Sequence, residues 1–111
     1  MIELKTRLRR TIHGHLVMET TVPLEGDFVL MIYTSKIKLA RYLETHAVVG
    51  QQGDGYTTTQ IFHDYNKTLA KEPVRATEKA IRTQHEQVLA TIDTILADVT
   101  RHYAGEPALL A

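Results

Sequence analysis

The sequence contains no cysteine, and serine and asparagine occur only once each, as Ser35 and Asn66, beside fifteen threonines. The missing cysteines exclude a disulfide scaffold, a thiol nucleophile and a thiolate-held zinc ion. The single serine lies in no nucleophile-elbow motif, which makes a Ser-His-Asp hydrolase site difficult to build. No run approaches the roughly 18 apolar residues of a membrane span, because the longest is residues 28–33. We therefore predict a cytoplasmic protein without membrane contact.

The chain also has no excess charge of either sign, since 13 basic side chains balance 13 acidic ones over 111 residues. A zero net charge disfavours nucleic acid as a partner, unless a local basic patch supplies the attraction. The length is that of one domain. We predict a single α+β domain over residues 1–105 and a flexible C-terminal tail over residues 106–111.

The first third of the chain alternates between apolar and polar residues, as strands with one buried face do. Residues 2–12 and 16–22 predict a β-hairpin, and a three-residue loop at 13–15 gathers the most apolar side chains on one face. This register sets Arg9 opposite Glu19. After a second turn, the apolar residues 28–33 predict a third strand, so the three strands form an antiparallel meander.

Helical signals follow. Residues 36–48 contain neither glycine nor proline and predict a helix that ends before Gly50. Residues 56–62 are β-branched and aromatic and predict a fourth strand, which residues 63–71 either prolong or follow as a short helix. Residues 73–103 predict one long amphipathic helix. The expected fold class is thus α+β, with a three-stranded antiparallel meander, a helix, a fourth strand and a long amphipathic C-terminal helix.

The long helix predicts self-association. Thirty-one helical residues would span about 46 Å, whereas a compact domain of this size is roughly 35 Å across. Either the helix kinks or its overhang packs on another subunit, and we predict a homodimer. The apolar positions expected at the dimer interface are Ile81, Val88, Ile92, Ile95 and Val99. His85 and His102 lie on or beside this stripe, either as pH-sensitive interface groups or as half-buried, hydrogen-bonded residues.

Two histidines flank a glycine in His13-Gly14-His15, where both imidazoles could face one metal ion. A catalytic zinc site needs three protein ligands, and His63 or His46 could supply the third only through the fold. The candidate metal ligands are therefore His13, His15 and His63. The alternative is that the two turn histidines are polar residues around a glycine with positive φ.

The segment RTIHGHLVMETTV, residues 10–22, resembles the strand–His-Gly-His–strand segment of the 6-pyruvoyl-tetrahydropterin synthase family. The resemblance implies that His13 and His15 are zinc ligands, as in that family. It covers about a dozen residues. The family's third zinc-binding histidine, upstream of this segment, and its cysteine nucleophile have no counterpart here.

A basic run in the first strand suggests anion binding. The candidate residues are Lys5, Arg7, Arg9, Lys36 and Lys38, the last two at the start of the expected helix. Nucleic-acid surfaces usually interleave aromatic and basic side chains, and the first 27 residues contain no aromatic residue. A solvated outer strand face is the alternative.

These signals lead to three functional hypotheses. No catalytic constellation is evident, so the leading one is a small non-enzymatic interaction module that acts as a homodimer, with another protein as a candidate partner. The second is a small zinc-dependent enzyme that uses the His13–His15 turn, zinc being the one cofactor considered. The third is nucleic-acid or anion binding through the basic first strand.

Overall fold

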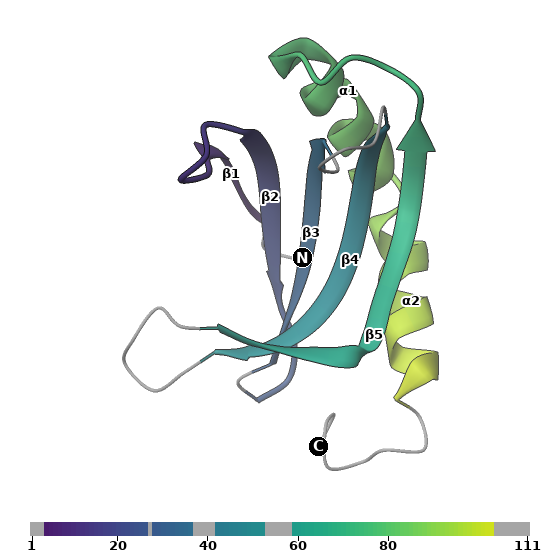
Figure 1. Ribbon diagram of the computed structural model, residues 1–111. Coiled ribbons are helices and arrows are strands. Elements are labelled where there is room, and N and C mark those ends of the chain that lie inside the picture. Colours follow the sequence, from purple (N-terminus) through teal and green to yellow (C-terminus); the bar gives the residue numbers. More distant parts are fainter. Residues whose placement is uncertain (1–3, 27, 37–41, 53–58, 104–111) are drawn as a thin grey trace.

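Figure 1 shows the structure, a computed structural model that describes residues 4–26, 28–36, 42–52 and 59–103, with the backbone alone at 52 and 59–64. Five strands precede two helices. The elements are β1 (Lys5–Arg10), β2 (Leu16–Pro23), β3 (Phe28–Lys36), β4 (Leu43–Gln52), β5 (Thr59–Glu72), α1 (Glu78–Leu89) and α2 (Ile92–His102).

The strands form one antiparallel sheet in the order β1-β2-β3-β4-β5, so each strand pairs with its neighbour in sequence. Both helices lie on one side of the sheet, toward β5, and the β1–β2 hairpin lies at the other end (Figure 1). The sequence-based fold class is therefore wrong in its details. The meander has five strands rather than three, no helix interrupts the strands in the part of the chain that the structure describes, and two helices replace the single long one.

The predicted helix over residues 36–48 is wrong because its C-terminal part is strand β4. Period-two alternation places Leu43, Thr45 and Ala47 on the helix-facing side of the sheet, and Glu44 and His46 on the other. Read at helical spacing, the same apolar residues had suggested a helix. The following Val48–Val49 pair is β-branched and favours the extended backbone. Of the other residues of the predicted helix, Lys36 ends β3, Tyr42 precedes β4, and residues 37–41 lie outside the described residues.

The β1–β2 hairpin has the expected three-residue loop, shifted by one position. The Thr11 N–H donates to His15 O, which closes the loop over residues 12–14, and Gly14 adopts a positive φ of 82°. The conformation is a turn followed by a left-handed glycine, which suits three-residue hairpin loops. The shift pairs Glu19 with Arg7 instead of Arg9. Because the register moves by an even number of residues, the predicted faces are retained.

The long helix predicted over residues 73–103 is divided at Ala90 and Thr91. The Thr91 hydroxyl donates to Val88 O at 2.7 Å, and the Thr91 N–H reaches the same carbonyl. Such local side-chain bonding competes with helical hydrogen bonding. The break corresponds to the first alternative above, in which the helix is not continuous, and the homodimer stays a prediction.

Two apolar clusters join the helices to the sheet. The larger contains Leu30 and Ile32 of β3 together with Val88, Ile95 and Val99 of the helices. A smaller cluster at the start of α1 joins Ile81 to the side chains of Met18 and Leu43. The Cα atoms span 41 × 30 × 28 Å, the dimensions of one compact domain. Among the described residues, neither helix is long and apolar enough to cross a membrane.

Candidate functional site

Neither described helix packs on the second face of the sheet. The strand register arranges fifteen side chains of this face in three rows that each cross all five strands, and we call them the open face. The first row is Lys5, Thr21, Met31, Val48 and Asn66; the second is Arg7, Glu19, Tyr33, His46 and Thr68; the third is Arg9, Val17, Ser35, Glu44 and Lys71. Ionisable groups therefore lie side by side although they are distant in sequence.

One end of the open face is organised around Glu19. Its two carboxylate oxygens accept hydrogen bonds from Arg7 Nε at 3.2 Å and from Arg9 Nε at 3.0 Å. The Glu19 side chain is only 15% exposed, whereas those of Arg7 and Arg9 are 69% and 40% exposed. The carboxylate thus lies low on the sheet, and both guanidinium groups project above it.

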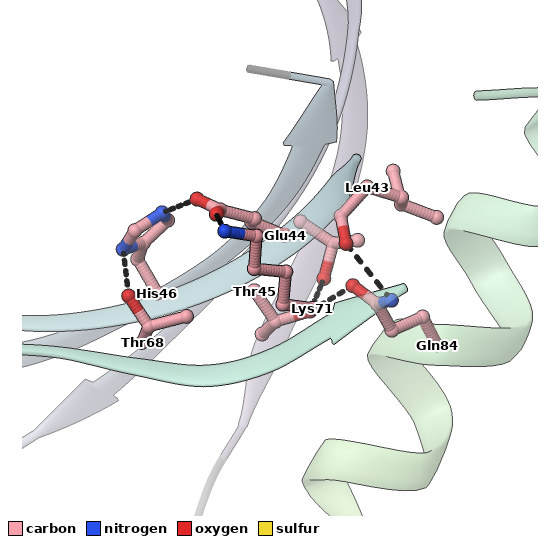
Figure 2. Close-up of polar contacts among 8 residues, drawn as sticks. Leu43, Glu44, Thr45, His46, Thr68, Lys71 and Gln84 are labelled. Carbon is pink, nitrogen blue, oxygen red and sulfur yellow. Dashed lines mark hydrogen bonds and ion pairs between the residues drawn. The ribbon is translucent and has the colours of Figure 1, made fainter. Parts of the chain in front are cut away.

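The other end repeats this arrangement around Glu44, as Figure 2 shows. Glu44 Oε2 lies 2.8 Å from His46 Nε2, and Glu44 Oε1 lies 3.7 Å from Lys71 Nζ. Since a carboxylate can only accept, His46 carries a proton on Nε2. His46 Nδ1 is 3.4 Å from Thr68 Oγ1, a long contact. The Glu44 side chain is 11% exposed and that of Lys71 is 52% exposed, so here too the cation stands outward.

Two tyrosines accompany these charges. Tyr33 occupies the centre of the second row, between Glu19 and His46. Burial raises the pKa of Tyr33, the negative charge of Glu19 raises it further, and Arg9 lowers it. Tyr42, just before β4, is 40% exposed, and Lys71 Nζ lies 4.4 Å from the centre of its ring. Because Lys71 also approaches Glu44, the Tyr42 ring belongs to the same side of the sheet.

A chain of hydrogen-bonded polar side chains, which we call the relay, lies on the helix-facing side of the sheet, behind the open face. Its threonines alternate with open-face residues along β1 to β4 and point toward the helices. The chain runs from Thr6 to Thr20, His85, Thr34, Thr45 and Gln84, with successive contacts of 2.7, 2.7, 2.8, 2.6 and 2.8 Å. From Thr20 to Gln84, each of these residues is at most 1% exposed. Part of this relay, Thr45 and Gln84, appears in Figure 2 on the opposite side of β4 from His46.

The hydrogen bonds of the relay all run in one direction. Gln84 Nε2 donates to Leu43 O and to Glu72, so its Oε1 must accept from the Thr45 hydroxyl. The Thr34 hydroxyl then donates to Thr45, which leaves the Thr34 oxygen to accept from His85. Burial lowers the pKa of His85 to about 4, so the ring is neutral at pH 7.

It follows that His85 carries its single proton on Nδ1, which donates to Thr34. His85 Nε2 accepts from the Thr20 hydroxyl, and the Thr20 oxygen accepts from Thr6. Every strand from β1 to β4 is thereby fixed relative to α1. Of the two readings of His85, the structure supports the hydrogen-bonded one, and the residue is fully buried rather than half-buried.

The predicted anion-binding residues are brought together only in part. Lys5, Arg7 and Arg9 are exposed on one face of β1. Lys36 is the direct partner of Leu43, which packs beneath α1, so Lys36 belongs to the helix-facing side of the sheet. Lys38 lies outside the described residues. Sequence alternation located the first group, but no sequence signal placed His46 and Lys71 on the same face of the sheet.

The predicted metal ligands are not brought together. His13 lies in the β1–β2 hairpin loop and His15 directly follows it, and both are exposed. His63 lies in the stretch of β5 opposite Val48 and Val49, three strands away and toward the other end of the sheet; its side chain is outside the described residues. Among the described residues, no three His, Cys, Asp or Glu side chains are grouped so as to hold a metal ion.

The predicted dimer-interface residues mostly line the core of the single chain. Ile81, Val88, Ile95 and Val99 are between 0% and 8% exposed, and Ile92 is partly buried against the same core. These side chains thus have intrachain partners in the sheet.

A groove of about 480 Å³ lies between β5 and the helices. Its charged groups and Tyr65 pair with one another, because Asp98 accepts hydrogen bonds from Tyr65, Lys67 and Arg101. These bonds hold the pKa of Asp98 below its usual value, Lys67 having the largest effect. The cluster therefore fastens α2 to β5 and leaves the open face as the better candidate site.

No family model matches the chain, and no curated protein or solved structure matches it either. Function is therefore inferred from the residues of the open face.

Proposed function

We propose that the protein is a non-enzymatic binding module that holds an anionic ligand on the open face of its sheet. The supporting observation is that the carboxylate side chains of this face are nearly buried whereas its cationic side chains are exposed. The three rows contain four cationic side chains, Lys5, Arg7, Arg9 and Lys71, and two carboxylates, Glu19 and Glu44. The carboxylates lie low and the cations project, so an approaching ligand meets positive charge first.

The low carboxylates also favour binding, because they hold the cations in place. Arg7 and Arg9 each use Nε on Glu19, which orients the rest of each guanidinium group before a ligand arrives. A guanidinium group has five N–H donors in a fixed fork and matches phosphate or carboxylate geometry. Less conformational entropy is then lost on binding than with two unrestrained arginines.

The test is binding of inorganic polyphosphate, measured by calorimetry over a series of salt concentrations. The variant Arg7→Gln/Arg9→Gln removes two open-face cations from exposed positions and should remain folded by circular dichroism. Its matched control, Arg82→Gln/Arg101→Gln, removes the same charge from the exposed surfaces of the two helices.

We expect the open-face variant to lose about tenfold or more in affinity at low salt, with a shallower salt dependence. The control should change by less than about threefold, because distant exposed charges are screened. Equal losses in both variants, or no binding by the original protein at low salt, would refute the proposal.

A further inference from the structure

We propose that the anionic ligand is single-stranded nucleic acid, whose bases stack on the tyrosines of the open face; this rests on the binding function proposed above. Proteins that bind single strands combine cations that follow the phosphates with aromatic rings that receive the bases. The sequence of β1 showed only the cations. The fold adds Tyr33 and Tyr42 from elements that follow much later.

The cations lie at the two edges of the sheet, on either side of the tyrosines. Three cations lie on β1, at one edge, and Lys71 lies on β5, at the other. Tyr33 on β3 and Tyr42 at the start of β4 lie between these edges. Phosphates held at the edges would therefore direct the bases of a crossing strand toward the two rings.

The two tyrosines are separated in a way that suits more than one base. Tyr33 belongs to the second row, and Tyr42 lies two residues beyond Glu44 of the third row, on the neighbouring strand. At about 3.3 Å per residue and 4.8 Å between strands, their Cα atoms are roughly 14 Å apart. Each ring can thus receive its own base along one extended strand.

Tyr42 is the better exposed of the two rings. It keeps 40% of its surface accessible, and Lys71 lies over its ring at 4.4 Å. The same lysine approaches Glu44, so the ring and the cation are held as a unit. Because Lys71 occupies one face of the ring, a base would stack on the other face, with this phosphate-binding ammonium group nearby.

A duplex fits this surface less well, because its bases are stacked on one another and do not present their faces to a protein ring. Inorganic polyphosphate could use the cations but would gain nothing from the tyrosines. The aromatic contribution therefore separates the proposed ligand from other polyanions.

The experiment compares fluorescence anisotropy titrations with three probes: a single-stranded oligonucleotide of about 15 nucleotides, supplied as RNA or DNA, the same sequence as a duplex, and inorganic polyphosphate. The variants are Tyr42→Ala and Tyr42→Phe, each checked for folding by circular dichroism. The exposed position of Tyr42 makes loss of the fold an unexpected result, and the Phe variant keeps the stacking surface.

We expect the single strand to bind more tightly than the duplex, and Tyr42→Ala to weaken single-strand binding by about tenfold, the loss of one stacking contact. Polyphosphate binding should be unchanged, and Tyr42→Phe should restore the single-strand affinity. If Tyr42→Ala leaves single-strand binding unaffected, or weakens polyphosphate equally, the nucleic-acid inference is wrong. Polyphosphate binding that still depends on Arg7 and Arg9 would in that case preserve the function proposed above.

Discussion

Thr20 and His85 are 65 residues apart in the sequence, yet Thr20 Oγ1 and His85 Nε2 meet at 2.7 Å in the core, and neither residue is exposed. The contact joins β2 to α1. It also belongs to a relay whose proton positions are all determined by one backbone carbonyl at its far end, that of Leu43. A neutral imidazole with one donor and one acceptor is the only histidine state that is compatible with these proton positions.

Replacing His85 should therefore be costly. In His85→Leu, the hydroxyls of Thr20 and Thr34 lose buried partners, and each unsatisfied group costs about 1–3 kcal/mol. We expect the free energy of unfolding to fall by about 2–4 kcal/mol, measured by urea denaturation. His13→Ala, at an exposed turn position, is the control and should change stability by less than about 0.5 kcal/mol. A His85→Leu protein as stable as the original would contradict the relay.

The same histidine should make stability depend on pH. Burial lowers the folded-state pKa of His85 to about 4, against an ordinary value of 6.5, so the unfolded chain takes up the proton first. Stability should be complete above pH 6.5 and decline as the pH falls from 6.5 toward 4. Denaturation midpoints across this range should fall less steeply in His85→Leu. Identical slopes in the two proteins would show that other groups control the acid response.

The charges beside Tyr33 should be visible in its titration. Glu19 raises the pKa of Tyr33 and Arg9 lowers it. We therefore expect Glu19→Gln to lower the pKa and Arg9→Gln to raise it, as followed by phenolate absorbance. Subtracting the absorbance titration of the Tyr33→Phe variant from that of the original protein gives the signal of Tyr33 without those of the other four tyrosines. Shifts of the opposite sign would mean that the second row of the open face is not assembled as described.

The helices should tolerate charge only on their outer sides. Ile95 is 5% exposed in the core, so Ile95→Asp places a carboxylate without a partner among apolar side chains and should unfold the domain. Ala97→Asp, two residues along on an exposed position of α2, should retain the native circular dichroism spectrum. A folded Ile95→Asp protein would instead place the apolar stripe outside the core of the single chain.

Sequence periodicity predicted the parts of the fold that depend on local alternation. The presence of the β1–β2 hairpin, the faces of β1 and strand β3 follow from a period of two and were predicted, but the predicted hairpin register was wrong by two residues. Strand β4 was missed because Leu43 and Ala47 are also spaced as on a helix, and only pairing with β3 and β5 decides between the two. The interruption near Thr91 depends on one hydroxyl reaching a backbone carbonyl, a competition that threonine allows but does not require.

The candidate site was predictable only at one edge. Arg7 and Arg9 share a strand with obvious alternation, so their common face could be foreseen. Their association with Tyr33 and His46 depends on the register of two further strand pairs, β2–β3 and β3–β4, the second of which involves a strand that was read as a helix. Cross-strand neighbours of this kind are a product of topology, and no spacing within the sequence encodes them.

The edge position of β1 has a consequence for how the open face behaves. Among the described strands, β1 is hydrogen-bonded to β2 alone, and it carries three of the four open-face cations. An edge strand can detach at a smaller free-energy cost than unfolding of the whole domain requires. The other edge strand, β5, is held to α2 through Asp98, so amide hydrogen exchange should be fastest in β1. Exchange in β1 should slow when a ligand engages the cations, so the protection of this one strand would report ligand binding.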